Sequence, residues 1–422
     1  MNWSFLYILL PVLALFVVLN YFLTRGRTWK KPGPYLINLF VAAVLVLVWL
    51  FVQESGGFSW KTDARYWEKF GAVLGALLLV ITILLQLSSF RRQQVENKFF
   101  ELIRYYRDNL QEMEMYNPFY YKDEQGEHGD RIVRGRRVIQ LIFEEYAIAF
   151  ELLKKRENLS ACIYLKEEMW GEYVRILNEN SGLNIPEEYA ADNKRKKEIL
   201  ENYILNDIAY QVTYWGMPLD ISTELCNGLQ KYFTNVAGCI DKFGQLPAVS
   251  HHPNSRWYAD QLKRFIKSFG KSNPDERTEF SCLVIGLGPD DHTNCAYPHV
   301  LSNYPKDFTK LFSGHQHRLG HFFGHLFHAI KYIDDQPWWL LSEHEKTEYV
   351  KSLRAQMSHY EQALLFIYSL SSLGYAWKSI KNKKGFISKY NLIKFLPKSF
   401  VGPMKPSDYF PEVDFEYKGE DE

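Results

Sequence analysis

The sequence has few cysteines and no excess of charge of either sign. Its 422 residues include five cysteines, which are scattered along the chain and form no C-x-x-C pair. This argues against a disulfide framework or a cysteine-rich zinc site, and free thiols are typical of a reducing compartment. Lys and Arg total 50 against 49 Asp and Glu, which argues against a protein that coats nucleic acid through its overall charge.

Charged side chains are also absent from three long stretches near the N-terminus, Met1–Thr24, Tyr35–Gln53 and Gly71–Ser89. Each has about the 20 apolar residues that a helix needs to cross ~30 Å of hydrocarbon, so we expect transmembrane helices at about 3–23, 35–53 and 71–89. The first stretch lacks the basic n-region of a signal peptide, and we expect it to be retained. The alternative for the third stretch is a buried helix of a soluble domain.

Basic residues between these stretches predict the topology. The connection 25–31 carries four basic residues and no acid, and Arg91 and Arg92 follow the third stretch. The positive-inside rule therefore places the N-terminus outside and everything beyond residue 90 in the cytoplasm. None of the stretches has an ionisable residue near its centre, as transporters and channels usually do. We expect them to form an anchor, or a pore through self-association.

The rest of the chain has mainly helical patterns. Apolar residues recur at a spacing of three or four in residues 99–106 and in Arg136–Lys155, and the polar segment Tyr120–Asp130 predicts a loop between these helices. Cys282–Leu287 is the one convincing strand candidate. We therefore expect a mainly α fold. It would comprise membrane helices in residues 1–90, one large cytoplasmic helical-bundle-like domain in residues 91–407, and an acidic tail in residues 408–422.

Five of the twelve histidines fall in Gly314–Tyr332. On a helix, the last four lie within an arc of roughly 80°. They are His317, His321, His325 and His328. Three interpretations stay open. His317 and His321 could share a zinc ion, although no acidic third ligand is in the same helix. The histidines could transfer protons while Arg318 stabilises an anionic phosphate. They could also form a polar face that hydrogen-bonds within a helical bundle.

A second helix is predicted over Glu348–Ser371. Arg354, Ser358 and Glu361 form a narrow polar stripe on it, and a buried Arg354 would need a partner such as Glu361. Arg354 and His359 have the R-x4-H spacing, but on one ideal helix they diverge by about 140°.

The chain beyond this helix is basic. Eight lysines and no acid lie in Lys378–Lys405, a pattern that favours phosphate backbones or anionic lipid as partners. Six acids follow in Pro411–Glu422.

Two stretches, LGHFFGHLFHAIKYI (Leu319–Ile333) and YVKSLRAQMSHYEQALLF (Tyr349–Phe366), resemble the AbiC-like phage abortive infection family of bacterial defence proteins. Weaker similarity extends over most of residues 99–396. The sequence departs from the family at Gly324, where a basic residue is usual, and at His359, where a small polar residue is typical. The resemblance implies phage exclusion through growth arrest or death of the infected cell, and it brings no settled biochemical mechanism.

Two functions are consistent with these patterns. In the first, a multi-pass protein of the bacterial inner membrane acts as a homo-oligomer in contact with membrane lipid. Its cytoplasmic domain responds to a phage-derived or co-encoded trigger and arrests growth through the membrane. In the alternative, the protein is a membrane-anchored, metal-independent ribonuclease similar to the HEPN group, whose R-x4–6-H spacing occurs twice, and Lys378–Lys398 guides RNA. No motif predicts a cofactor. The candidate catalytic residues are Arg318, His321, His325, Arg354, His359 and Glu361.

Overall fold

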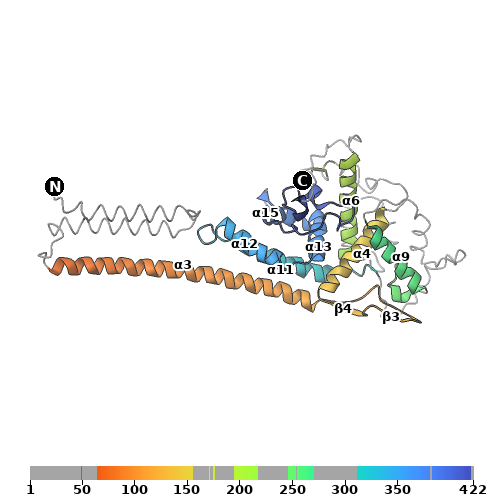
Figure 1. The fold of residues 1–422 in the computed structure, drawn as a ribbon, viewed down its shortest axis with the longest axis horizontal. Coiled ribbons are helices and arrows are strands. Elements are labelled where there is room, and N and C mark those ends of the chain that lie inside the picture. The colour runs from red at the N-terminus through yellow and green to blue at the C-terminus, as the bar shows by residue number, and fades with distance from the viewer. Residues whose placement is uncertain are drawn as a thin grey trace. The chain divides into compact units, whose positions relative to one another are not determined.

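The computed structural model describes residue 49 and residues 64–154, 171, 174–175, 194–216, 246–252, 254–269, 311–380 and 383–419. These residues are mainly helical, as predicted (Figure 1). The spans predicted at 3–23 and, apart from Trp49, at 35–53 lie outside the described residues, as does the strand candidate Cys282–Leu287. The longer helices are α3 (Ala64–Glu112), α4 (Arg136–Lys154), α6 (Lys194–Trp215), α9 (Ser255–Ser268), α11 (Gln316–Asp334), α12 (Glu343–Arg354) and α13 (His359–Leu370).

The chain divides into two compact units. The first comprises Met1–Ile103 and His328–Val350, and the second comprises Arg104–Phe327 and Lys351–Glu422. Short elements complete the second unit. They are β1 (Glu114–Tyr116), β2 (Tyr121–Asp123), β3 (Gly126–His128), β4 (Ile132–Arg134), η3 (Val249–His251), η6 (Ser372–Gly374), α14 (Tyr375–Lys378), β5 (Ser379–Ile380), β6 (Lys383–Lys384), α15 (Phe386–Tyr390), α16 (Pro406–Tyr409) and η7 (Glu416–Gly419).

The third predicted span is part of α3, a continuous helix of 49 residues that also includes the first predicted cytoplasmic helix (Figure 1). Its most apolar window has a mean hydropathy of 2.5, and none of that window is buried. Leu79 is 60% exposed. A buried helix of a soluble core, the alternative for Gly71–Ser89, does not fit this exposure. Among the described residues, α3 is the one helix long and apolar enough to cross a membrane.

Within the first unit, the turn between α11 and α12 lies against the end of this apolar stretch. The Arg91 guanidinium lies 5.8 Å from the ring centroid of Trp339, and Arg92 Nη2 lies 2.8 Å from Glu345 Oε1. The neighbouring Trp338 is 63% exposed. These contacts place two adjacent tryptophans beside the first basic residues that follow the apolar stretch.

The core of the second unit is built around α4. The helix predicted over Arg136–Lys155 is confirmed over Arg136–Lys154, and residue 155 lies outside the described residues. Nearly every side chain from Val138 to Leu153 is buried, and α6, α9 and α13 pack against it (Figure 1). The Tyr146 hydroxyl donates to Asn206 Oδ1 at 2.7 Å, and Asn206 Nδ2 donates to the Ile367 carbonyl at 3.1 Å. These two bonds link α4, α6 and α13 through the middle of the core.

The segment Tyr120–Asp130, predicted as a loop, forms the antiparallel hairpin of β2 and β3. Outside it, β1 pairs antiparallel with β4. The prediction was wrong because strands of three residues leave no alternating pattern long enough to detect. The turn itself has the expected chemistry, since Gln125 N donates to Asp123 Oδ1 at 2.8 Å and Gly126 has a φ of 126°. Asx turns and left-handed glycines are typical of such tight connections.

The single helix predicted over Glu348–Ser371 is also wrong, because the structure has two helices there. α12 ends at Arg354, and Ser358 is the N-cap of α13, with Glu361 completing a capping box. The side chain of Ser358 satisfies the backbone N–H of Glu361, while the Glu361 carboxylate accepts from the backbone N–H of Ser358. A new helix start is therefore favoured over continuation. Arg354 and His359 consequently lie on different helices.

The acidic segment after residue 408 is folded in its first part. Tyr409, Phe410, Val413 and Phe415 are buried. Lys394 Nζ lies 2.6 Å from Asp414 Oδ2. One lysine of the basic stretch is thus neutralised by the segment that we expected to be a separate tail.

Candidate functional site

A close backbone crossing fixes the N-terminus of α11. Gly216, just after α6, and Gly314, just before α11, have φ values of 78° and 87°. A Cβ on Gly216 would lie 2.5 Å from the backbone nitrogen of Gly314, and a Cβ on Gly314 would lie 2.5 Å from the Trp215 carbonyl oxygen. Only glycine fits at either position. His315 N then donates to the Tyr214 carbonyl at 2.9 Å, so the crossing positions His315.

His315 forms a buried pair with Glu145 of α4. Its Nε2 lies 2.9 Å from Glu145 Oε2, and the two side chains are 0% and 1% exposed. Arg318, one turn along α11, places Nη1 3.3 Å from His315 Nδ1. A guanidinium can only donate, so Nδ1 accepts and the ring proton is on Nε2, where it is donated to Glu145. A neutral imidazole therefore connects a cation to a carboxylate.

Arg318 also holds strand β1. Its Nε and Nη2 donate to the Glu114 carbonyl at 3.1 and 2.9 Å. Burial lowers the pKa of Arg318 from its ordinary value, and the carboxylates of Glu145 and Glu114 oppose that shift. Three nitrogens of this guanidinium are engaged within the fold. Its predicted role, to hold a substrate phosphate, stays a prediction.

Three of the four other histidines of α11 face solvent. His317, His321 and His328 are exposed and His325 is half-buried. The rings of His321 and His325 are stacked, with centroids 6.3 Å apart. The expectation that the stripe is the polar face inside a bundle is therefore wrong for the three exposed histidines. A Cβ on Gly324 would meet no atom within 4 Å, so there is open space at this position of α11.

His317 and His321 were the candidate metal ligands. In the part of the chain that the structure describes, no group of three or more His, Cys, Asp or Glu side chains is arranged to hold a metal ion. Burial lowers the pKa of His317, and the charge of Arg318 lowers it further. A neutral imidazole is the form that binds metals, but two histidines alone do not complete a zinc site.

Arg354 closes the C-terminal end of α15. It is buried, and its Nη1 donates to the carbonyls of Asn391 and Tyr390 at 3.0 and 3.4 Å. Its guanidinium lies 4.9 Å from the ring centroid of Phe395. Asn391 has a φ of 52° and caps α15, so Arg354 satisfies carbonyls that a helix end leaves without partners.

Glu361 is paired with Arg136 of α4, whereas the sequence suggested Arg354. Glu361 Oε1 lies 3.5 Å from Arg136 Nε, and the Glu361 side chain is 0% exposed. Burial raises the pKa of Glu361, while the Ser358 hydrogen bonds and the charge of Arg136 oppose that shift. Burial and the nearby Glu361 carboxylate raise the pKa of Tyr106. His359, the first residue of α13, has its ring 5.9 Å from that of Phe400.

The structure therefore brings together pairs that the sequence did not predict, Glu145–His315 and Arg136–Glu361. A signal for the first was present, since Glu145 occupies an apolar-periodic position of a helix that is otherwise hydrophobic. Buried carboxylates are rarely left without a partner. His315, Glu145 and Glu361 are enclosed and already paired, so they support the fold. Of the candidate site residues on α11, the histidines of the stripe are the accessible acid–base groups.

Comparisons with known proteins agree with the resemblance in the last third of the chain. No curated protein and no solved structure matches the sequence. Residues 314–401 match the model of the family described as "Putative phage abortive infection protein". This region begins at the glycine crossing and contains α11, α12, α13 and α15. Residues 314–401 are thus similar to the phage abortive infection family.

Proposed function

We propose that this protein is an abortive infection protein of the bacterial inner membrane, in which a cytoplasmic helical domain responds to phage infection and arrests growth through the membrane. The family match at residues 314–401 carries this proposal. Three spans, with the N-terminus outside and residues beyond about 90 in the cytoplasm, remain our proposal for the topology.

The first unit supports a membrane role. Exposing the apolar stretch of α3 to water would be unfavourable, because the removal of apolar surface from water is the main favourable term in folding. Trp338 and Trp339 lie beside Arg91, at the end of this stretch. Tryptophan and basic side chains are enriched at the membrane–water interface. The turn between α11 and α12 would then lie at the cytoplasmic surface and connect the family-matched region to the bilayer.

The second unit supports a responding domain without chemistry of its own. Arg318, Arg354 and Glu361 contact carbonyls, backbone amides or buried partners, so each contributes to the fold. In this proposal, a phage-derived or co-encoded trigger binds this unit and homo-oligomers transmit the response.

One observation favours the alternative, a membrane-anchored, metal-independent ribonuclease. His321 is exposed and His325 is half-buried, and their rings lie close enough to act on one substrate. Two imidazoles can serve as the acid and the base of phosphodiester cleavage. Lys378–Lys398 would guide the RNA.

Plaque assays on cells that express the full chain test the first proposal. We expect fewer plaques and poor survival of infected cells at high multiplicity, with loss of membrane potential before loss of RNA. A variant lacking Met1–Ser89 should lose protection, and the His321→Ala/His325→Ala variant should keep it. If the truncated chain protects and the alanine variant does not, the ribonuclease alternative replaces the membrane proposal. If no variant of the chain affects plaque formation by any phage tested, both are wrong.

A further inference from the structure

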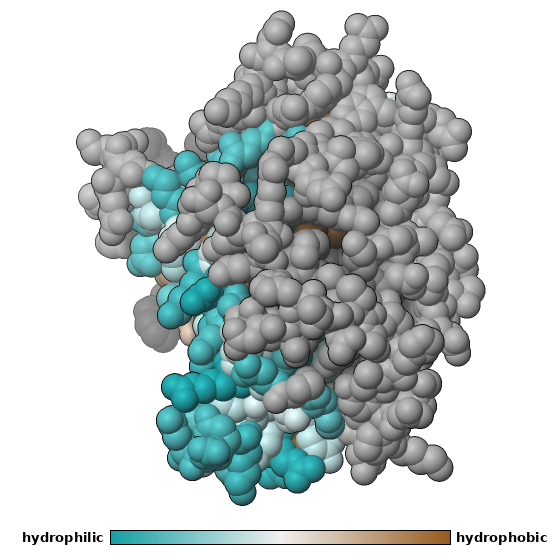
Figure 2. All heavy atoms as spheres, turned by 90° about the vertical axis from the view of Figure 1, so that its right-hand side faces the viewer, coloured by the Kyte–Doolittle hydropathy of each residue, from teal (hydrophilic) through white to brown (hydrophobic). Residues whose placement is uncertain are grey.

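A cavity in the second unit, outside the family-matched region, has the features of a ligand site. It has a volume of about 550 Å³ and is lined by α4, α9, the β2–β3 hairpin and the segment before β2. Small-molecule sites commonly have volumes of ~300–1,000 Å³. Figure 2 views the side of the molecule where α9 and β3 lie in Figure 1, and its described atoms are mostly hydrophilic.

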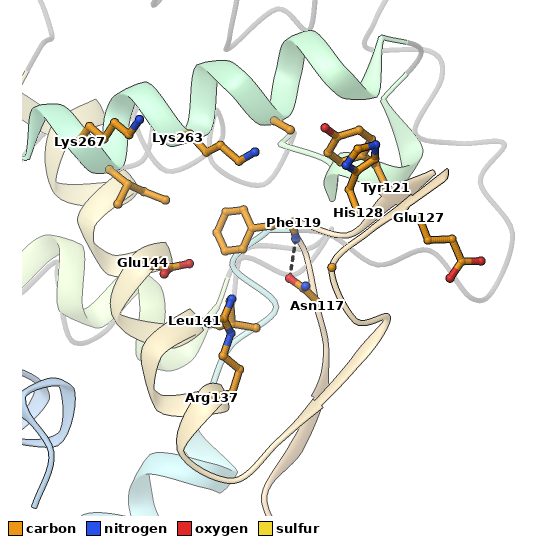
Figure 3. Close-up of a pocket in the computed structure, with 13 residues that line it drawn as sticks. Asn117, Phe119, Tyr121, Glu127, His128, Arg137, Leu141, Glu144, Lys263 and Lys267 are labelled. Atoms are coloured by element: carbon orange, nitrogen blue, oxygen red, sulfur yellow. Dashed lines mark hydrogen bonds between the residues drawn. The ribbon is translucent and has the colours of Figure 1, made fainter. Parts of the chain in front are cut away.

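Three cationic side chains lie around this cavity. Lys263 and Lys267 are one turn apart on α9, and Arg137 belongs to α4. Figure 3 shows the two lysines extending from one side of the space, with Arg137 and Glu144 on the other side. Among the residues that the structure describes, none of the three cations is in an ion pair. Two like charges one turn apart on a helix repel each other, so an anion bound beside the two lysines would relieve this repulsion.

The acids near the cavity do not cancel this charge. Glu127 points away from the space in Figure 3, and its Oε1 lies 3.5 Å from Lys122 Nζ. Glu144 faces the space and accepts a hydrogen bond from Gln140 Nε2 at 2.7 Å. Burial raises the pKa of Glu144, while its hydrogen bond from Gln140 and the charge of Arg137 oppose that shift. When ionised, this one carboxylate faces three cations.

Aromatic and apolar groups form the rest of the wall. Phe119 lies between the lysines and Arg137 in Figure 3. Its position is set by an Asx turn in which Phe119 N donates to Asn117 Oδ1 at 3.0 Å. Tyr121 and His128 stack at one end, with ring centroids 4.4 Å apart. Leu141 and Ile266 add aliphatic surface. The ligand should therefore combine a strong anion with a flat, partly apolar ring.

We propose that this cavity binds a mononucleotide, with its phosphate held by Lys263, Lys267 and Arg137 and its base against Phe119. Inorganic phosphate would leave the aromatic wall unused, and a nucleoside would bring no anion to the two lysines or to Arg137, whose Nη1 donates to Gln140 Oε1 at 3.1 Å. The site is independent of the membrane proposal, because all of its residues belong to the second unit.

Isothermal titration calorimetry on the full chain in detergent micelles tests the site. The probes are the four ribonucleoside monophosphates, the matching nucleosides and inorganic phosphate. We expect at least one monophosphate to bind tenfold or more tightly than its nucleoside and than inorganic phosphate. Lys263→Gln/Lys267→Gln should weaken that binding at least tenfold, and Phe119→Leu should weaken it several-fold without affecting inorganic phosphate. Glu144→Gln should strengthen it, because the variant removes the carboxyl charge from the cavity.

The matched control is Arg264→Gln, which removes a cation from the same helix at a position that does not line the cavity. It should bind as the unmodified chain does. The proposal is overturned if no monophosphate binds, or if the control and the double lysine variant lose affinity equally. It is also overturned if single-stranded oligonucleotides bind in a lysine-dependent way and mononucleotides do not, since the lysines would then mark a nucleic-acid surface.

Discussion

The buried pair of Glu145 and His315 is the residue-scale feature on which the second unit depends most directly. Removing one member of a buried hydrogen-bonded pair leaves the other without compensation, at a cost of about 3–5 kcal/mol. We expect His315→Ala to lower the free energy of unfolding by that amount and Glu145→Gln to lower it less, because glutamine can still accept from Nε2. Denaturant unfolding of the full chain in detergent, followed by circular dichroism, measures both.

The control for this prediction is His321→Ala. His321 is exposed on the same helix, and surface substitutions usually change stability by less than about 0.5 kcal/mol. Equal destabilisation by His315→Ala and His321→Ala would contradict the assignment of His315 to the core.

Glu361 gives the stability of the fold a pH dependence with a definite sign. Its pKa is raised above the ordinary 4.5, chiefly by burial, so the folded chain holds this proton more tightly than the unfolded chain does. Its contribution to stability is fully present below pH 4.5 and is lost as pH rises through the raised pKa. Glu361→Gln should therefore show a smaller fall in thermal midpoint than the unmodified chain between about pH 4 and pH 8. An equal or larger fall in the variant would show that Glu361 is not responsible.

At the scale of elements, the crossing of Gly216 and Gly314 is required for α6 and α11 to end and begin where they do. Gly314→Ala would place a Cβ 2.5 Å from the Trp215 carbonyl oxygen in a left-handed backbone conformation. We expect this added methyl group to lower the thermal midpoint more than the methyl group added by Gly324→Ala does. His315 should also lose its alignment with Glu145.

Gly324→Ala is the matched control for Gly314→Ala. A Cβ at Gly324 meets no atom within 4 Å, and alanine is favoured over glycine inside a helix by about 1 kcal/mol. This variant should be neutral or more stable. If both alanine variants behave alike, the crossing does not constrain the fold.

The elements that were predictable from sequence are those with long periodic patterns. The 3–4 spacing of apolar residues around Val138 and Leu141 predicts the described residues of α4, and the apolar run Gly71–Ser89 predicts the exposed part of α3. The break before α13 was missed although Ser358 and Glu361 have the capping-box spacing. The apolar residues on both sides of the break suggested one continuous helix. The local hydrogen bonds of the capping box favour a new helix start more strongly.

The candidate site was less predictable because its pairs are distant in sequence. Arg318 and His321 could be placed on one helix from spacing alone. The apolar arc of that helix, which the structure buries, is also visible in the sequence, but the spacing does not indicate which residues of other helices pair with its polar groups. The partners Glu145 and Arg136 come from α4, far from the histidine-rich stretch. The way in which α4 packs against the other helices decides which residues pair across such distances. The periodicity of the sequence carries no information about that packing.

At the scale of the whole molecule, the proposed topology predicts where the chain meets the membrane. A reporter fused after Gln93 should show a cytoplasmic signal, and a reporter fused after Gly57 a periplasmic one. Trp338→Ser/Trp339→Ser should leave the chain in the membrane fraction but make Lys346 more accessible to a water-soluble amine reagent, because the turn between α11 and α12 would lose its interfacial anchor. Lys346 is 4% exposed, and its Nζ donates to the Asp334 carbonyl at the start of this turn at 2.7 Å. A periplasmic signal at Gln93 would overturn the topology, and unchanged labelling would overturn the anchoring of the turn.

The pairing of α4 with α11 and α13 also limits how such proteins can be recombined. The family-matched region begins at residue 314, yet its buried His315 and Glu361 have their partners at Glu145 and Arg136. In a chimaera joined just before α11, His315 and Glu361 would face an α4 helix from another protein. That helix need not carry the partners that Glu145 and Arg136 provide here. Breakpoints placed before α4 keep both pairs in one parental segment. The smallest inheritable module of this domain is therefore longer than the stretch by which it is recognised.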